Sequence, residues 1–97
     1  MLLYDSVKVG ASVEEIDTPA LLIDLDALEK NIRLVSEYYK SKKGALLPHQ
    51  KGHRLPIIAR KQIDAGARGV SMTSFSLAGY YVGCGIKDIF ITSGNIW

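Results

Sequence analysis

Residues 49–54 read His-Gln-Lys-Gly-His-Arg and place four side chains that could do chemistry within six positions. A lysine attacks an aldehyde only when its amine is neutral, and burial or neighbouring positive charge favours that state by lowering the lysine pKa. Arg54, His49 and His53 could supply such charge beside Lys51. Lys51 is therefore a candidate nucleophile, and a solvated basic loop is the alternative interpretation.

Two other kinds of chemistry have weaker support. His49 and His53 could ligate a metal ion, but two histidines without a nearby cysteine or carboxylate make a weak zinc signal. Cys84 could be a nucleophile, yet it follows Gly83 where a helix is expected to end, and a free cysteine is commonly a small buried hydrophobe. We expect no metal ligand in this sequence and no catalytic role for Cys84.

Predicted strands and helices alternate along the chain and determine where Lys51 lies. The predicted strands are residues 20–25, 45–48, 69–73 and 88–92, and the predicted helices are residues 27–40, 55–65 and 76–82. Asp26 offers the first helix an N-cap, with Glu29 three residues later as in a capping box. Strands joined by helical crossovers pair in parallel, and their carboxyl ends face the active site. Lys51 lies shortly after the carboxyl end of the strand predicted at residues 45–48.

The spacing of these elements predicts an α/β fold, the N-terminal part of a (β/α)8 TIM-type barrel. Successive predicted strands begin about 20 to 25 residues apart, which is typical of barrel units, and a whole barrel needs about 250 residues. The 97 residues of the sequence would therefore form about three and a half units. A doubly wound sheet is the alternative, but no glycine-rich phosphate-binding turn follows residues 20–25. We expect residues 1–97 to be one partial barrel domain.

The composition limits the kinds of partner and the location that we expect for the protein. A net charge of +2 from 12 basic and 10 acidic residues is too balanced to predict binding to nucleic acid or to an anionic membrane. The longest apolar run, residues 20–23, is far shorter than the roughly 20 residues that cross a bilayer. The N-terminus does not read as a secretion signal, and the single cysteine agrees with a reducing compartment. We therefore expect a cytoplasmic protein.

Two segments of the sequence are similar to a known family. Residues 17–32 read Asp-Thr-Pro-Ala-Leu-Leu-Ile-Asp-Leu-Asp-Ala-Leu-Glu-Lys-Asn-Ile, and residues 48–53 read Pro-His-Gln-Lys-Gly-His, with Ile-Ala-Arg at 58–60. Together they resemble the opening of the D-threonine aldolase and D-serine dehydratase group. This group lies within the alanine racemase-like, fold-type III class of pyridoxal-phosphate enzymes. The resemblance covers residues 16–92.

The resemblance implies roles for three residues of the loop. Lys51 would bond to the aldehyde of pyridoxal 5'-phosphate, whose pyridine ring acts as an electron sink. Once a D-amino acid has displaced Lys51, its amine would act as a base. His49 and His53 would shape the cofactor pocket or tune the lysine, with a packing role as the alternative for each. Two departures from the family pattern are Leu47, where an arginine is frequent, and Leu77, where a glutamate is usual.

The resemblance also implies an activity. The complete protein would be a lyase that cleaves a D-β-hydroxy amino acid in an aldol reaction of the D-threonine type. The alternatives are a D-serine dehydratase, a non-catalytic pyridoxal-phosphate-binding protein and a non-functional remnant. A C-terminal β domain, which supplies divalent-metal ligands in several members, would lie outside residues 1–97, and the complete protein would be a homodimer. We expect the 97 residues alone to be inactive and poorly stable.

Overall fold

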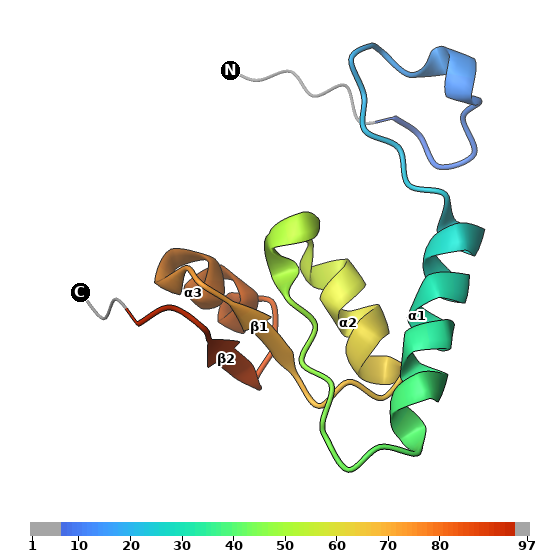
Figure 1. Ribbon diagram of the computed structural model, residues 1–97. Coiled ribbons are helices and arrows are strands. Elements are labelled where there is room, and N and C mark those ends of the chain that lie inside the picture. Colours follow the sequence, from blue (N-terminus) through green and yellow to red (C-terminus); the bar gives the residue numbers. More distant parts are fainter. Residues whose placement is uncertain (1–6, 95–97) are drawn as a thin grey trace.

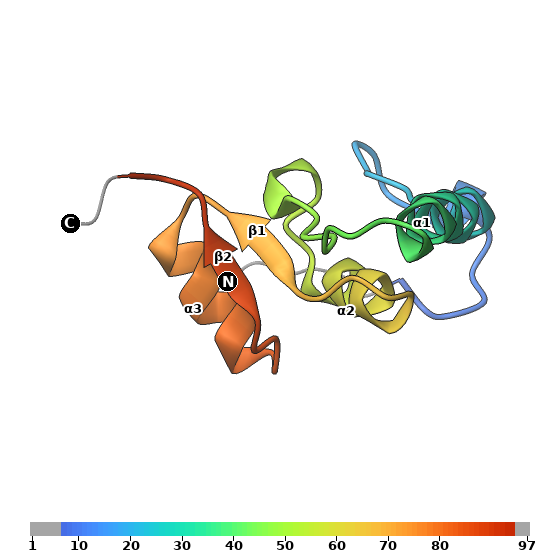
Figure 2. The ribbon, with the colours of Figure 1, turned by 60° about the horizontal axis from the view of Figure 1, so that its bottom comes forward.

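The computed structural model describes residues 7–94, which form three helices and a small parallel sheet (Figure 1). The helices are α1 (Leu25–Lys40), α2 (Pro56–Asp64) and α3 (Phe75–Gly83), and the strands are β1 (Val70–Met72) and β2 (Ile89–Ile91). Two short 3-10 helices, η1 (Val13–Glu15) and η2 (Gln50–Gly52), complete the order η1-α1-η2-α2-β1-α3-β2. Both views show α1 at the opposite end from α3, with α2 between α1 and the sheet (Figures 1 and 2).

The sheet has the parallel pairing that alternating strands and helices predict. Val70 pairs with Ile89 and Met72 with Ile91, and α3 is the crossover between the two strands. This pairing confirms the α/β class and the βα units expected at residues 69–92. The predicted helix at 55–65 is also confirmed as α2, which ends just before Gly66, a residue with φ of 115°.

Residues 45–48, predicted as a strand, run beside β1 but form only an isolated parallel bridge between His49 and Ser71. The backbone N–H of Ser71 donates to the Pro48 carbonyl at 2.9 Å, and that of Arg68 donates to the Leu46 carbonyl at 3.0 Å. Pro48 has no N–H to return, so the ladder is short. The segment still occupies the position of a third parallel strand.

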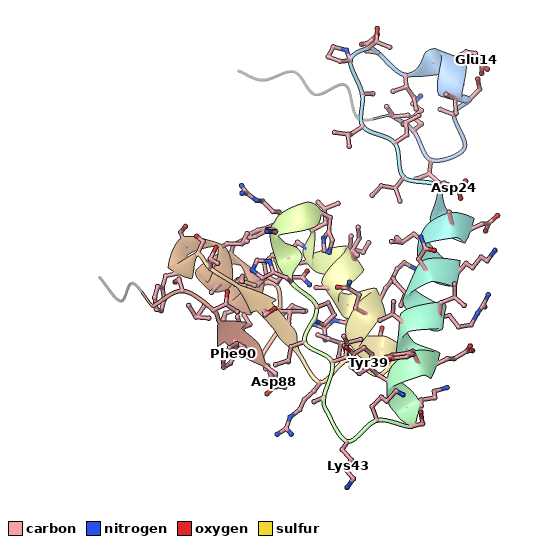
Figure 3. The ribbon with its side chains drawn as sticks, in the orientation of Figure 1. Glu14, Asp24, Tyr39, Lys43, Asp88 and Phe90 are labelled. Carbon is pink, nitrogen blue, oxygen red and sulfur yellow. The ribbon has the colours of Figure 1, made fainter. Side chains whose placement is uncertain are left out.

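The prediction of a strand at residues 20–25 is wrong. The segment runs away from the sheet above α1 (Figure 1), and the Leu21 side chain is 97% exposed. No strand among residues 7–94 lies beside it to accept its hydrogen bonds. The N-cap of α1 is Asp24 and not Asp26: its carboxylate accepts from the Ala27 N–H at 2.9 Å, so the helix begins at Leu25 (Figure 3).

The core of the described residues lies between the sheet, α2 and α3. Its fully buried members are Ala59 of α2, Val70 and Met72 of β1, Tyr81 of α3, and Ile86 in the loop between α3 and β2. Burying these side chains removes apolar surface from water, which is the main favourable term in folding. Helices α2 and α3 both contribute to the cluster that contains β1. They therefore fix two segments at the carboxyl end of β1: η2, which precedes α2, and residues 73–74, which precede α3.

Helix α1 packs on α2 away from this core. The Ser36 hydroxyl donates to the Ala65 carbonyl at the end of α2, and Lys61 forms an ion pair with Glu29 at 2.6 Å. Glu29 therefore pairs across helices and is not the partner of a capping box. None of the described helices is long and apolar enough to cross a bilayer.

The Glu29–Lys61 ion pair gives a modest prediction. Both side chains are more than a third exposed, and ion pairs at that exposure are worth about 0.2–1 kcal/mol. Glu29→Gln should lower the free energy of unfolding by no more than about 1 kcal/mol, measured by urea denaturation at low salt. Glu37→Gln, on the same helix and outside this pair, is the control. A much larger loss for Glu29→Gln would contradict an exposed, screened pair.

Candidate functional site

Lys51 lies in η2, directly after the carboxyl end of the segment that runs beside β1. His49 is the N-cap of η2, and its Nδ1 accepts a hydrogen bond from the Lys51 backbone N–H at 3.1 Å. An imidazole that accepts at Nδ1 carries its proton on Nε2 when it is neutral. The histidine thus fixes the start of the turn, and Nε2 is its donor nitrogen.

A pocket of about 400 Å³ opens at this edge of the sheet. It is lined by residues of η2 and its flanks, the end of β1 and the start of α3: His49, Lys51, Arg54, Met72, Thr73, Ser74, Ser76, Leu77 and Tyr80. The volume falls within the roughly 300–1,000 Å³ typical of small-molecule sites. The pocket also lies at the carboxyl ends of parallel strands, where α/β folds hold their active sites.

The lining has two chemical halves. Lys51 and Arg54 contribute positive charge, hydroxyl groups come from the end of β1 and the start of α3, and none of the described lining residues carries a carboxylate. The Ser74 hydroxyl accepts from the Leu77 N–H at 3.2 Å as the N-cap of α3. Leu77 and Tyr80 supply apolar surface, and the buried Met72 lies at the back of this part of the lining. A flat apolar molecule that carries an anionic group matches both halves.

Arg54 owes its place to an unusual backbone conformation. Its φ is 54°, the left-handed region that side chains other than glycine rarely adopt, and its N–H donates to the Gln50 carbonyl at 2.9 Å. The bond closes η2 and turns the chain into α2. Strained residues of this kind cluster at functional sites, in agreement with the position of Arg54 on the pocket.

The structure brings Lys51 and His49 together on the pocket and leaves His53 outside its lining. His53 precedes α2, and its Nδ1 accepts from the Leu55 N–H at 3.0 Å. Its Nε2 is buried and has no hydrogen-bond partner within residues 7–94. Burial lowers the pKa of His53 below its ordinary value because the charged imidazole would lose solvation there.

This burial predicts a pH dependence of stability. A histidine whose pKa is lowered by folding binds fewer protons in the folded state, so folding is favoured above the unfolded pKa of about 6.5 and weakens as pH falls below it. The free energy of unfolding of the native chain should therefore fall between about pH 7.5 and pH 5.5. His53→Asn keeps a side-chain acceptor for the Leu55 N–H and should flatten that fall. An equal slope in both proteins would contradict the assignment.

Cys84 differs from its expected burial, because its side chain is exposed at the C-terminal cap of α3. In the described part of the chain, no three or more His, Cys, Asp or Glu side chains gather where they could hold a metal ion. Sequence reasoning missed the hydroxyl groups of Thr73, Ser74 and Ser76. Thr73 ends the strand predicted at residues 69–73 and the two serines follow it, at the same edge as Lys51; this position was the available signal.

The described residues match the N-terminal part of a fold-type III α/β barrel, and the Lys51 loop lies at the carboxyl end of its parallel strands. No family model matches the chain. D-threonine aldolase of Arthrobacter sp is 38% identical over 84 residues, which are 87% of this chain and 22% of that protein. The chain therefore spans about a fifth of the relative that it matches.

Two solved structures are similar to the chain and come from the same group of proteins. The crystal structure of D-threonine aldolase from Filomicrobium marinum has a TM-score of 0.84 and 39% identity over 88% of this chain and 23% of its own. A variant of D-threo-3-hydroxyaspartate dehydratase has a TM-score of 0.80 and 29% identity over 84% of this chain and 21% of its own. The chain is thus homologous to the N-terminal portion of the D-threonine aldolase and hydroxyaspartate dehydratase group.

Proposed function

We propose that this chain supplies the cofactor-binding lysine of a pyridoxal-phosphate-dependent lyase that acts on a D-β-hydroxy amino acid. The observation that carries the proposal is the position of Lys51 on the 400 Å³ pocket, beside His49 and Arg54. Because the chain spans 22% of its aldolase relative, the activity is proposed for a polypeptide of the relatives' length. In that protein residues 1–97 are part of the barrel domain. The resemblance leads us to propose a homodimer, and the single cysteine agrees with a location in the cytoplasm.

The pocket fits pyridoxal phosphate in three respects. Apolar surface from Leu77 and Tyr80 suits an aromatic ring, and the Lys51 amine suits its aldehyde. Arg54 and the hydroxyl groups beside it suit the negative charge of a phosphate or of a substrate carboxylate. When bound, the cofactor withdraws electrons from the carbon next to the substrate amine.

The residues of the chain then have separate tasks. Lys51 would hold the cofactor through Nζ, and the same amine, when free, could accept or return a proton. His49 orients the turn through the hydrogen bond that its Nδ1 accepts from the Lys51 N–H. Arg54 offsets negative charge at the mouth of the pocket, and the apolar wall limits access of water. We propose His53 as a support of the loop and not as a contact of the cofactor.

Aldol cleavage is the first candidate reaction, supported by 38% and 39% identity to two D-threonine aldolases. Dehydration is the second, supported by the likeness to D-threo-3-hydroxyaspartate dehydratase. Both reactions begin from a D-amino acid with a β-hydroxyl group. Incubation of the relative-length protein with D-threonine separates them: aldol cleavage releases glycine and an aldehyde, whereas dehydration releases ammonia and a keto acid. A divalent ion should be included and omitted, because the resemblance implies a metal in several members.

The cofactor assignment is tested directly on this chain. The full chain is incubated with pyridoxal phosphate, reduced with borohydride, digested and mapped by mass spectrometry. We expect the adduct on Lys51 in preference to lysines outside the pocket lining, such as Lys43, which Figure 3 shows in the loop after α1. Uniform labelling of all lysines would contradict the proposal.

A further inference from the structure

A buried polar network lies directly beneath the Lys51 loop. Gln50 is fully buried, with 0% of its surface exposed, although it stands next to the exposed Lys51. Its Nε2 donates to the Pro48 carbonyl and to Gln62 Oε1, each at 3.0 Å. Its Oε1 accepts from the Tyr81 hydroxyl at 3.2 Å. Both amide hydrogens and the amide oxygen therefore have partners inside the protein.

The network joins three elements at one residue. Pro48 ends the segment beside β1, Gln62 lies on α2 and Tyr81 lies on α3. Burial raises the pKa of the Tyr81 hydroxyl, which keeps it protonated and available as a donor. A buried amide that loses a partner is costly, so these bonds favour one orientation of Gln50 over others.

That orientation determines where Lys51 points. A 3-10 helix has three residues per turn, so neighbouring side chains diverge by about 120°. With Gln50 held inward by its three bonds, the side chain of Lys51 is turned out toward the pocket that it lines. An apolar residue at position 50 could fill the same space, but it would leave Gln62 and Tyr81 without these bonds.

We propose that Gln50, held by Gln62 and Tyr81, is a positioning residue that aims Lys51 into the pocket. The inference rests on the proposed function of Lys51. It also explains why a polar side chain occupies the most buried position of the loop.

The test uses the full chain and conservative variants that keep the core filled. Tyr81→Phe removes one hydroxyl and retains the ring, Gln62→Leu removes the acceptor, and Gln62→Glu restores an acceptor at a half-buried position. We expect Tyr81→Phe and Gln62→Leu each to slow borohydride-trapped labelling of Lys51 by pyridoxal phosphate about fivefold, the effect of one hydrogen bond. Gln62→Glu should label close to the native rate.

A matched control separates positioning from loss of stability. Ser36→Ala removes the hydrogen bond between α1 and α2 and should leave the labelling of Lys51 unchanged. Hydrogen exchange at the Lys51 N–H, measured without cofactor, should accelerate in Tyr81→Phe and Gln62→Leu but not in Ser36→Ala. Circular dichroism verifies that each variant is folded under the labelling conditions.

Three results would overturn the inference: native labelling rates in Tyr81→Phe and Gln62→Leu, no recovery in Gln62→Glu, or an equal loss in Ser36→Ala. Failure of the native chain to label Lys51 would instead reject the proposed function. The exchange measurement then still decides whether the network orders the loop, so the two failures are distinguishable.

Discussion

Lys51→Ala is expected to abolish the borohydride-stable adduct that the chain forms with pyridoxal phosphate in the pocket. The imine that borohydride reduces to a stable adduct forms from a primary amine, and Lys51 is the one lysine among the described residues that line this pocket. Lys51→Arg should lose the adduct as well, because a guanidinium keeps the positive charge but is not a nucleophile at neutral pH. The visible absorption of the bound cofactor should disappear in both variants.

The control for this experiment is Lys43→Ala, which removes an exposed lysine from the loop after α1. It should leave the adduct and its spectrum unchanged. An unchanged spectrum in Lys51→Ala would reject the assignment of the cofactor lysine. Retention of the adduct in Lys51→Arg, at another lysine on peptide mapping, would reject it equally.

Gly69→Ala is expected to destabilise the sheet strongly. Gly69 is buried directly before β1, and an added Cβ would overlap the Asp88 carbonyl oxygen and lie 2.7 Å from Asp88 Cβ. That carbonyl accepts the Val70 N–H at 2.9 Å, the bond that begins the pairing of β1 with the segment of β2. Overpacking against backbone costs about 1–3 kcal/mol and at times more, so the midpoint of urea denaturation should fall markedly.

Gly79→Ala provides the matched substitution. Gly79 is exposed within α3, and a Cβ there would meet no atom within 4 Å. Because glycine in a helix interior is less favourable than alanine by about 0.5–1 kcal/mol, this change should stabilise the protein. Opposite signs for the two glycine-to-alanine changes would support the close approach at Gly69, and equal small effects would contradict it.

Local signals in the sequence predicted most of the regular structure. Apolar periodicity and end signals such as Pro56 and Gly66 predicted α2 within one residue at either end, and the α/β order followed from alternating strands and helices. These features depend on neighbours in the chain. The parallel pairing of β1 and β2 followed from the helix between them.

The exceptions depend on contacts that local patterns do not contain. Residues 20–25 have the apolar composition of a buried strand, but strand formation needs a partner, and none lies beside this segment within residues 7–94. The position of the α1 N-cap followed from the same error, since Asp24 had been placed inside a strand. A partner strand is a property of the fold and not of the segment.

Part of the candidate site was predicted from the sequence, and part was not. The family motif located Lys51 and His49, which both line the pocket. The bonds of Gln50 to Gln62 and Tyr81 join residues 12 and 31 positions apart, a separation at which no sequence pattern was evident. The left-handed backbone of Arg54 was also unexpected, because arginine has no preference for it.

Cys84 has a practical consequence for studying this loop. It is the single cysteine of the sequence, its thiol is exposed, and its backbone N–H bonds to the Tyr81 carbonyl at the end of α3. A maleimide dye would therefore attach to one atom of the native chain without any engineered residue. The dye would stand three residues beyond the tyrosine that holds Gln50, outside the pocket lining, and its fluorescence could report on loop order in real time.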